Sequence, residues 1–363
     1  MSNKERKKKK PILKTILLIV FLALCATLGF AVWNVFDSLK PVQTESEIVE
    51  FEVGEGASVT SLTNQLEAAG IIKNAKIAYY YVRMNNLGDL KAGKFRIDKS
   101  WDLEKIFTTL NDQSAIIIEN VPVTIIEGDW AKDIAYKISQ TLDNVTYEDL
   151  IALWSDHDWL TSVMDDYPFL TESIFDEDIR IPLEGYLAPE TYYFDIDMNA
   201  EEATRMILDQ TLTVFNQFKE QIEASEYTRH QIYTLASIIQ YEAGTKEEDL
   251  KLIAGVFFNR LKIDMALQSS VTVCYAIDFD KENDTWQACE VNSQFDSPYN
   301  TYMYPGLPPG PIENPGVKAL EAVLNPTESN YYYFMADVYG DGTVYYAETL
   351  EEHNQNVAKY LGQ

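Results

Sequence analysis

The chain has 363 residues, of which 46% are hydrophobic and 12% aromatic, enough for a membrane anchor and two or three packed units. The formal net charge is −28, although residues 1–14 carry seven basic side chains against one glutamate. So acidic a body repels a phosphate backbone, and we therefore expect no nucleic-acid partner. The three histidines lie far apart, and no two cysteines are two or four residues apart, so we expect no metal; we also predict no cofactor.

The N-terminus has the pattern of a membrane anchor. Residues 16–33 are eighteen uncharged, mostly apolar residues, about the minimum for crossing a bilayer, and Val35 and Phe36 extend them. The basic run before them places residues 1–15 in the cytoplasm and everything after Asp37 outside the cell membrane, with a single pass over residues 16–36. A cleaved signal peptide is the alternative, but the bulky residues from Trp33 to Phe36 do not form a small-residue cleavage site.

Alternating helix and strand patterns follow a polar linker over residues 37–47. The pattern predicts a strand at Ile48–Val53, a helix carrying Val59, Leu62 and Leu66 that ends at Gly70, a helix at Ala75–Met84, a strand over residues 94–97, a helix carrying Leu103, Ile106, Phe107 and Leu110, and a strand over residues 115–126. The mixture indicates an α+β fold.

A strand–Glu-Gly–helix unit occurs twice, 72 residues apart. Glu55-Gly56 precedes the first helix, and Glu127-Gly128 precedes a second one that carries Ala131, Ile134 and Ile138. The unit resembles the first half of a LysM glycan-binding module, and a generic β-turn-α unit is the alternative. We accordingly divide the chain into a LysM-like module at residues 48–118 and a catalytic domain at residues 119–363, with its core at 183–363.

The second half is rich in helix signals. Residues 146–180 are acidic and predicted to be helical, residues 183–192 form a turn and strand, and helices follow over residues 200–224 and 227–243. Cys274 and Cys289 lie outside the membrane span. They either form a disulfide that closes a loop of about fifteen residues or remain two buried thiols, and the spacing does not decide between these.

Glu242 is the most informative residue. Leu235, Ile238, Ile239 and Glu242 recur at helical spacing, so one apolar face ends in a carboxylate, and Gly244 is predicted to end the helix. Apolar neighbours and the negative end of the helix dipole both raise a carboxyl pKa, which suits a general acid for glycosidic cleavage. The alternative is a structural glutamate paired with an arginine such as Arg260.

Two segments flank this position. Residues 245–248 have the pattern of a capping box that opens a second helix, with Leu250, Ile253, Ala254, Phe257 and Leu261 facing inward. Residues 297–316 (SPYNTYMYPGLPPGPIENPG) contain six of the thirteen prolines together with Tyr299, Tyr302 and Tyr304. Such a stiff, aromatic segment either forms the wall of a sugar-binding groove or is a rigid structural loop.

Several short motifs resemble the endolytic murein transglycosylase family (MltG, YceG-like). They are residues 235–243 (LASIIQYEA), 253–261 (IAGVFFNRL), 267–269 (LQS), 299–302 (YNTY), 306–312 (GLPPGPI), 314–316 (NPG), 325–326 (NP), 333–337 (YFMAD) and 353–354 (HN), in this order, and the resemblance covers about residues 45–363. Two positions depart from the family pattern: Gln240 stands where members commonly carry a glutamate, and residues 269–273 read SSVTV instead of SDPTV.

The resemblance implies a lyase with Glu242 as catalytic residue. It would cleave MurNAc–GlcNAc linkages of peptidoglycan, leave 1,6-anhydro-MurNAc ends, terminate growing strands and work beside a peptidoglycan synthase or elongation and division proteins. Candidates for substrate contact or for support of the site are Gln268, Asn259, Tyr299, Asn300 and Tyr302. The competing functions are a water-using muramidase, with Glu184, Glu190 or Glu313 as second carboxylate, and a non-catalytic glycan-binding scaffold.

Overall fold

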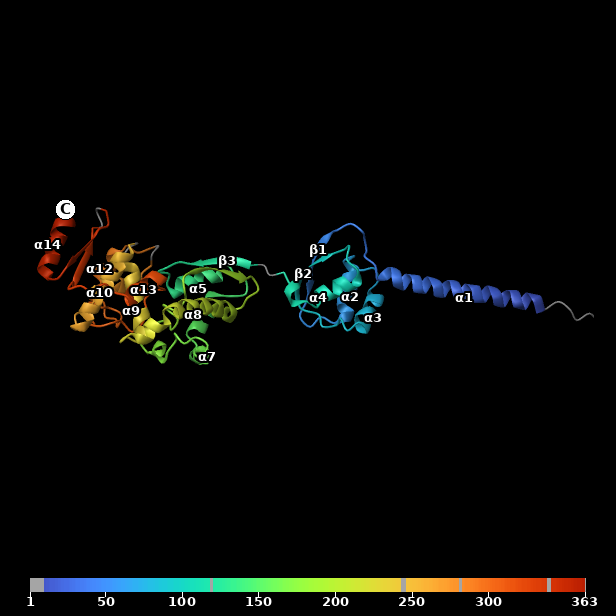
Figure 1. Cartoon of the computed structure of the whole chain (residues 1–363), viewed down its shortest axis with the longest axis horizontal. Helices are drawn as coiled ribbons and strands as arrows, with labels where there is room; N and C mark the ends of the chain where they lie inside the picture. Colours follow the sequence, from blue (N-terminus) through green and yellow to red (C-terminus); the bar gives the residue numbers. More distant parts are fainter. Residues whose placement is uncertain (1–9, 118–119, 243–245, 281–282, 338–340, 363) are drawn as a thin grey trace, which may run out of the picture. The chain divides into compact units, whose positions relative to one another are not determined.

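The computed structural model describes residues 10–117, 120–242, 246–280, 283–337 and 341–362. The chain divides into two compact units, Met1–Glu119 and Asn120–Gln363 (Figure 1). Both units mix helices with antiparallel two-stranded sheets, so the α+β class is confirmed.

The first helix, α1 (Lys10–Ser38), contains the predicted span. Its residues Thr15–Ser38 form a helix long and apolar enough to cross a membrane, and the side chains of residues 15–36 are all exposed. Asp37 and Ser38, assigned from the sequence to a linker, are the last residues of this helix. Lys73 Nζ lies 3.1 Å from Asp37 Oδ2, and the Leu103 amide donates to the Leu39 carbonyl at 3.2 Å, so the end of α1 is attached to the rest of the first unit.

The remainder of the first unit packs helices on a β-ribbon. Its elements are β1 (Ile48–Val53), α2 (Val59–Ala68), α3 (Ala75–Met84), β2 (Gly93–Asp98), α4 (Leu103–Leu110) and the 3₁₀ turn η1 (Gln113–Ala115). Strands β1 and β2 pair antiparallel, from Ile48 opposite Asp98 to Val53 opposite Gly93. Side chains of Ser58, Asn74 and Asp102 accept backbone N–H groups at the starts of α2, α3 and α4, which explains why each helix begins there.

The second unit holds the remaining elements. They are β3 (Asn120–Ile125), α5 (Ala131–Ser139), α6 (Tyr147–Trp154), α7 (His157–Val163), η2 (Glu172–Phe175), β4 (Glu190–Asp195), α8 (Ala200–Ala224), α9 (Arg229–Glu242), α10 (Glu247–Lys262), α11 (Ser270–Ala276), α12 (Gln287–Val291), α13 (Val317–Leu324), β5 (Tyr333–Ala336), β6 (Val344–Ala347) and α14 (Leu350–Tyr360). Strand β3 pairs antiparallel with β4, and β5 with β6.

The repeat seen in the sequence has the same form in both units. Strands β1 and β3 begin at Ile48 and Asn120, helices α2 and α5 at Val59 and Ala131, and each pair keeps the 72-residue offset. Gly56 and Gly128 turn the chain in the left-handed region, with φ of 66° and 85°. The strand predicted over residues 115–126 is shorter than expected, because Ala115 ends the 3₁₀ turn η1 and β3 begins only at Asn120.

Helix α9 lies at the centre of the second unit. It packs against α8, α10, α11 and α13, and every residue from Ile232 to Ile239 is buried. The burial exceeds the single apolar face predicted from the sequence. Two of its buried hydroxyls bond within the helix: Thr234 Oγ1 donates to the His230 carbonyl at 2.7 Å, and Ser237 Oγ to the Thr234 carbonyl at 2.8 Å. The helix is therefore a rigid support for the residue at its end.

Candidate active site

Glu242 is the last residue of α9, where the buried helix reaches the surface. Its side chain is partly exposed, and Ser269 Oγ donates a hydrogen bond to its Oε1 at 2.6 Å. Helix α10 begins at Glu247, with Lys246 in the N-cap position. Ala243, Gly244, predicted to end α9, and Thr245, predicted to cap α10, lie outside the described residues.

The carboxyl group of Glu242 has a raised pKa. Burial is the largest cause, because removal from water disfavours the carboxylate. The hydrogen bond from Ser269 and the positive charge of Arg260 act in the opposite direction, since both favour the carboxylate, but burial outweighs them. The group therefore holds its proton to a higher pH than an ordinary glutamate, as a general acid requires.

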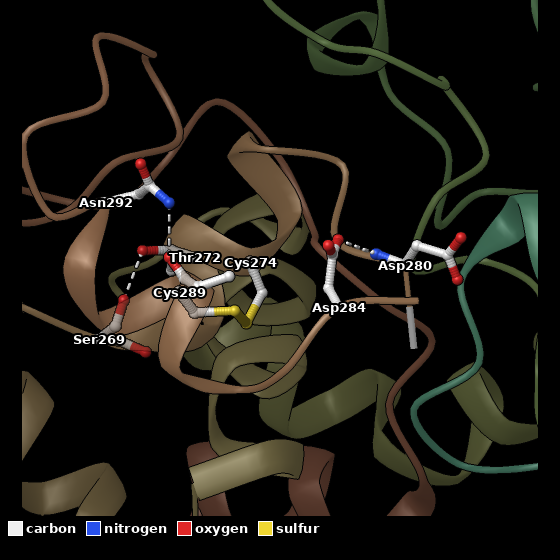
Figure 2. Close-up of a disulfide and its surroundings, with 8 residues drawn as sticks. Ser269, Thr272, Cys274, Asp280, Asp284, Cys289 and Asn292 are labelled. Carbon is white, nitrogen blue, oxygen red and sulfur yellow. Dashed lines mark hydrogen bonds between the residues drawn. A yellow bond between two sulfur atoms is a disulfide. The ribbon is translucent and has the colours of Figure 1, made fainter. Parts of the chain in front are cut away.

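Ser269 is held in place by a cluster of hydroxyls. Its backbone N–H donates to Thr301 Oγ1 at 3.1 Å, its carbonyl accepts from Thr272 Oγ1 at 2.7 Å, and the two threonine hydroxyls lie 2.9 Å apart. Figure 2 shows the contact between Ser269 and Thr272 beside the disulfide. The role of Ser269 was missed from the sequence, although the residue belongs to the motif at residues 267–269.

Arg260 stabilises the loop that carries Ser269. Its guanidinium is buried and donates to the carbonyls of Leu267 at 2.6 Å and Tyr332 at 2.6 Å. Among the ion pairs of the described residues, none joins Arg260 to Glu242, and the guanidinium instead bonds to these two carbonyls. The charge of Arg260 acts on Glu242 at longer range.

Two of the candidate substrate residues lie next to Glu242. Gln268 is exposed, has a left-handed backbone with φ of 48°, and donates its N–H to the Thr301 carbonyl at 3.1 Å, one residue from Ser269. Tyr302 is half-buried, and its pKa is raised by burial and then by the negative charge of Glu242. The structure thus brings the phenol of Tyr302 near the carboxyl and places Gln268 next to the serine that bonds to it.

The other three candidates have mainly structural contacts. Asn300 is fully buried and donates to the carbonyls of Ser293 and Phe295 at 3.0 and 2.7 Å, while buried Tyr299 packs on Tyr275 at a ring distance of 4.8 Å. The amide of Asn259 donates to the carbonyls of residues 329 and 331 at 2.8 and 3.0 Å. Asn259 also lines a groove of about 460 Å³ whose lining does not include Glu242.

The proline-rich segment packs directly on α9. The N–H of Ile312 donates to Ser237 Oγ at 3.0 Å, and the N–H of Gly316 donates to Gln240 Oε1 at 2.9 Å. Gln240, the position where family members commonly carry glutamate, therefore holds this segment against the helix two residues before Glu242. An amide oxygen suits the task because it accepts from a backbone N–H without burying a charge.

Glu184 belongs to the protein interior. It is buried, accepts from the Ala131 N–H at 3.0 Å and from Asn314 Nδ2 at 3.1 Å, and burial raises its pKa to about 8. Glu190 starts strand β4 opposite Ile125. Glu313 is buried and lines a narrow crevice together with Tyr241, the residue before Glu242. Of the three candidate second carboxylates, Glu313 is therefore the one that shares a crevice with Tyr241, the residue preceding Glu242 in the chain.

Cys274 of α11 and Cys289 of α12 form a disulfide, which decides between the two possibilities that the sequence left open (Figure 2).

Among the described residues, no group of three or more His, Cys, Asp and Glu side chains is placed to bind a metal. A half-buried carboxylic acid with a raised pKa, oriented by one hydroxyl, has the composition of a general acid–base site.

Comparison with known proteins identifies the family. Residues 51–359 match the model of the YceG-like family, and the chain belongs to this family. An endolytic murein transglycosylase of Bacillus subtilis is 34% identical over 328 residues, covering 89% of this chain and 88% of that protein. The endolytic murein transglycosylase of Streptococcus pneumoniae serotype 2 is 34% identical over 362 residues, which cover 94% of this chain but only 64% of the relative.

A solved structure supports the fold. The crystal structure of a putative YceG-like protein from Listeria monocytogenes has a TM-score of 0.59 and 34% sequence identity, and covers 86% of this chain and 99% of that one. The chain spans less than two thirds of the length of the Streptococcus relative, which is therefore a longer protein.

Proposed function

We propose that this protein is a membrane-anchored lytic transglycosylase that cleaves MurNAc–GlcNAc linkages within peptidoglycan glycan strands. The observation that carries the proposal is Glu242: a carboxyl group with a raised pKa, at the end of a rigid buried helix, with its orientation set by Ser269. The names of the Bacillus and Streptococcus relatives, both endolytic murein transglycosylases, support the same activity.

A single carboxyl group is sufficient for this reaction. Protonated Glu242 gives its proton to the glycosidic oxygen as the bond from this oxygen to C1 of MurNAc breaks. The resulting carboxylate then takes the proton of the MurNAc 6-hydroxyl while that oxygen bonds to C1. A 1,6-anhydro end forms, the proton is back on Glu242, and no water is consumed, so the second carboxylate of a hydrolase is not required.

Ser269 and Arg260 support Glu242 in this mechanism, and two further side chains are placed to contact the substrate. Ser269 Oγ donates to Glu242 Oε1 and stabilises the carboxylate formed after the first proton transfer. Arg260 holds the loop that carries Ser269 and adds positive charge at longer range. The exposed Gln268 and the half-buried Tyr302 are the side chains that we propose contact the glycan.

The apolar helix α1 supports a location of this chemistry at the membrane. We propose that α1 is a single-pass anchor with its basic N-terminus in the cytoplasm, so that the chain after Asp37 lies outside the cell membrane. The order β1–α2–α3–β2 supports a LysM-like, glycan-binding role for residues 48–118. An enzyme anchored in this way would act on nascent glycan strands next to a peptidoglycan synthase and terminate their elongation.

The test compares Glu242→Gln with Glu248→Gln in the full-length protein in detergent. Glu248 is an exposed acid in the first turn of α10, close in sequence and without a resolved role at the site, so it controls for loss of charge. With purified peptidoglycan, we expect cleavage by wild type and Glu248→Gln and none by Glu242→Gln. Equal cleavage by all three contradicts the assignment of Glu242. Binding without cleavage by wild type indicates the non-catalytic scaffold.

A further inference from the structure

An aromatic pair lies directly beside Glu242. Tyr241, the preceding residue, is 46% exposed, and its ring stacks on that of Trp286 with 5.1 Å between ring centroids and 6° between ring planes. Trp286 immediately precedes α12 and contacts Phe279 edge-on at 6.2 Å. Trp286 lies against one face of the Tyr241 ring, and nearly half of the tyrosine is still exposed to solvent.

The crevice next to this pair is apolar with one acid at its wall. Its lining comprises Trp130, Tyr241, Val271, Cys274, Phe279, Trp286, Ile312 and Glu313. Its volume of about 10 Å³ is the space of about one water molecule, so no sugar ring enters it. A ligand at this place must lie across the exposed surface of the aromatic pair.

The disulfide fixes the position of Trp286. Helix α12 has only five residues, and so short a helix is not stable by itself. Cys289 joins it to Cys274 of α11 (Figure 2), and α11 starts immediately after Ser269. The Ser269 hydroxyl in turn donates to Glu242. The bridge therefore connects the segment that orients the carboxyl with the segment that carries the tryptophan, and both cysteines are buried.

We propose that the stacked rings of Tyr241 and Trp286 form a saccharide-binding subsite, on which the C–H face of a hexosamine ring of the glycan strand packs beside the linkage that Glu242 cleaves. Flat aromatic surfaces with exposed faces suit sugar rings, whose hydroxyls remain in water at the rim. The inference rests on the proposed function, because it takes the same glycan as ligand. It adds a recognition surface made by a disulfide-bridged segment.

The experiment uses the full-length Glu242→Gln protein in detergent, which is expected to bind without cutting. The probe is purified glycan strands freed of their stem peptides. All tryptophans are replaced by 5-fluorotryptophan, and the ¹⁹F resonance of Trp286 is identified by its loss in Trp286→Phe. We expect this resonance to shift on addition of glycan, while that of Trp154, buried in the core and bonded to Thr204 at 2.8 Å, stays unchanged.

Affinity is then measured for Trp286→Ala and Trp286→Phe in the same background. Loss of a stacking ring is expected to weaken binding about 3- to 10-fold for the alanine variant, and less than about twofold for phenylalanine, which keeps an aromatic face. With Glu242 intact, Trp286→Ala should raise KM by a similar factor and change kcat little.

The outcomes separate the subsite from the proposed function. Unchanged affinity of Trp286→Ala together with an unshifted Trp286 resonance overturns the subsite, while cleavage that depends on Glu242 leaves the proposed function intact. If Trp286→Ala does not fold, the resonance of the native Trp286 decides alone. Absence of glycan binding and of cleavage by the wild type overturns both.

Discussion

Ser269→Ala isolates one interaction of the candidate site. The substitution removes only the hydroxyl that donates to Glu242 Oε1 at 2.6 Å, because the bonds from Ser269 to Thr301 and Thr272 use its backbone N–H and carbonyl. A hydrogen bond to a charged group contributes about 1.5–3 kcal/mol. If about half of the charge on Glu242 has developed in the transition state, the loss there is about 1 kcal/mol, so kcat falls about fivefold.

The pH profile gives the stricter test of the same variant. The Ser269 hydroxyl lowers the pKa of Glu242, so its removal raises that pKa further and the protonated acid persists to higher pH. We expect the alkaline limb of kcat/KM to move to higher pH in Ser269→Ala while its plateau falls. Ser270→Ala, one residue on, is the control and should match wild type. A limb that stays in place or moves to lower pH in Ser269→Ala refutes the reasoning.

Three further predictions concern stability and are checked by chemical denaturation of the full-length protein in detergent. Asn300→Ala removes the buried amide that donates to the carbonyls of Ser293 and Phe295, so the free energy of unfolding should fall by about 1–2 kcal/mol; no loss contradicts a structural role. Reduction of the Cys274–Cys289 bridge should cost about 3 kcal/mol for a loop of 15 residues, and Cys274→Ser/Cys289→Ser should be insensitive to reductant. The pKa of Glu184 in the folded protein is about 8, above its ordinary value of 4.5, so the free energy of unfolding should fall as the pH rises from about 4.5 through about 8. Glu184→Gln should flatten this pH dependence. An equally steep profile in the variant contradicts the prediction.

Local patterns predicted most elements of the fold. Ile48–Val53, Ala75–Met84 and residues 200–224 are strand or helices with the expected bounds, because alternation, helical spacing and side-chain caps are all encoded within a few residues. The 72-residue repeat was readable for the same reason. The complete burial of α9 was not, since it depends on helices α8, α10, α11 and α13 that come from distant parts of the chain.

The candidate site was predictable only in part. Glu242 stands out because a carboxylate ends an apolar helical face, and the motif resemblance reinforced it. The hydroxyl that orients it comes from Ser269, 27 residues further along, and no spacing rule links the two positions. The stack of Tyr241 on Trp286 likewise depends on the disulfide-bridged segment, whose pairing the cysteine spacing alone left open.

The most direct test of the proposed chemistry is product analysis in H₂¹⁸O. Full-length protein in detergent is incubated with purified peptidoglycan, and the new glycan ends are identified by mass spectrometry. The account predicts 1,6-anhydro-MurNAc ends that contain no ¹⁸O and that are absent with Glu242→Gln. Reducing ends that carry ¹⁸O, each one water heavier, would contradict a lyase and indicate a water-using muramidase with Glu313 as the first carboxylate to substitute.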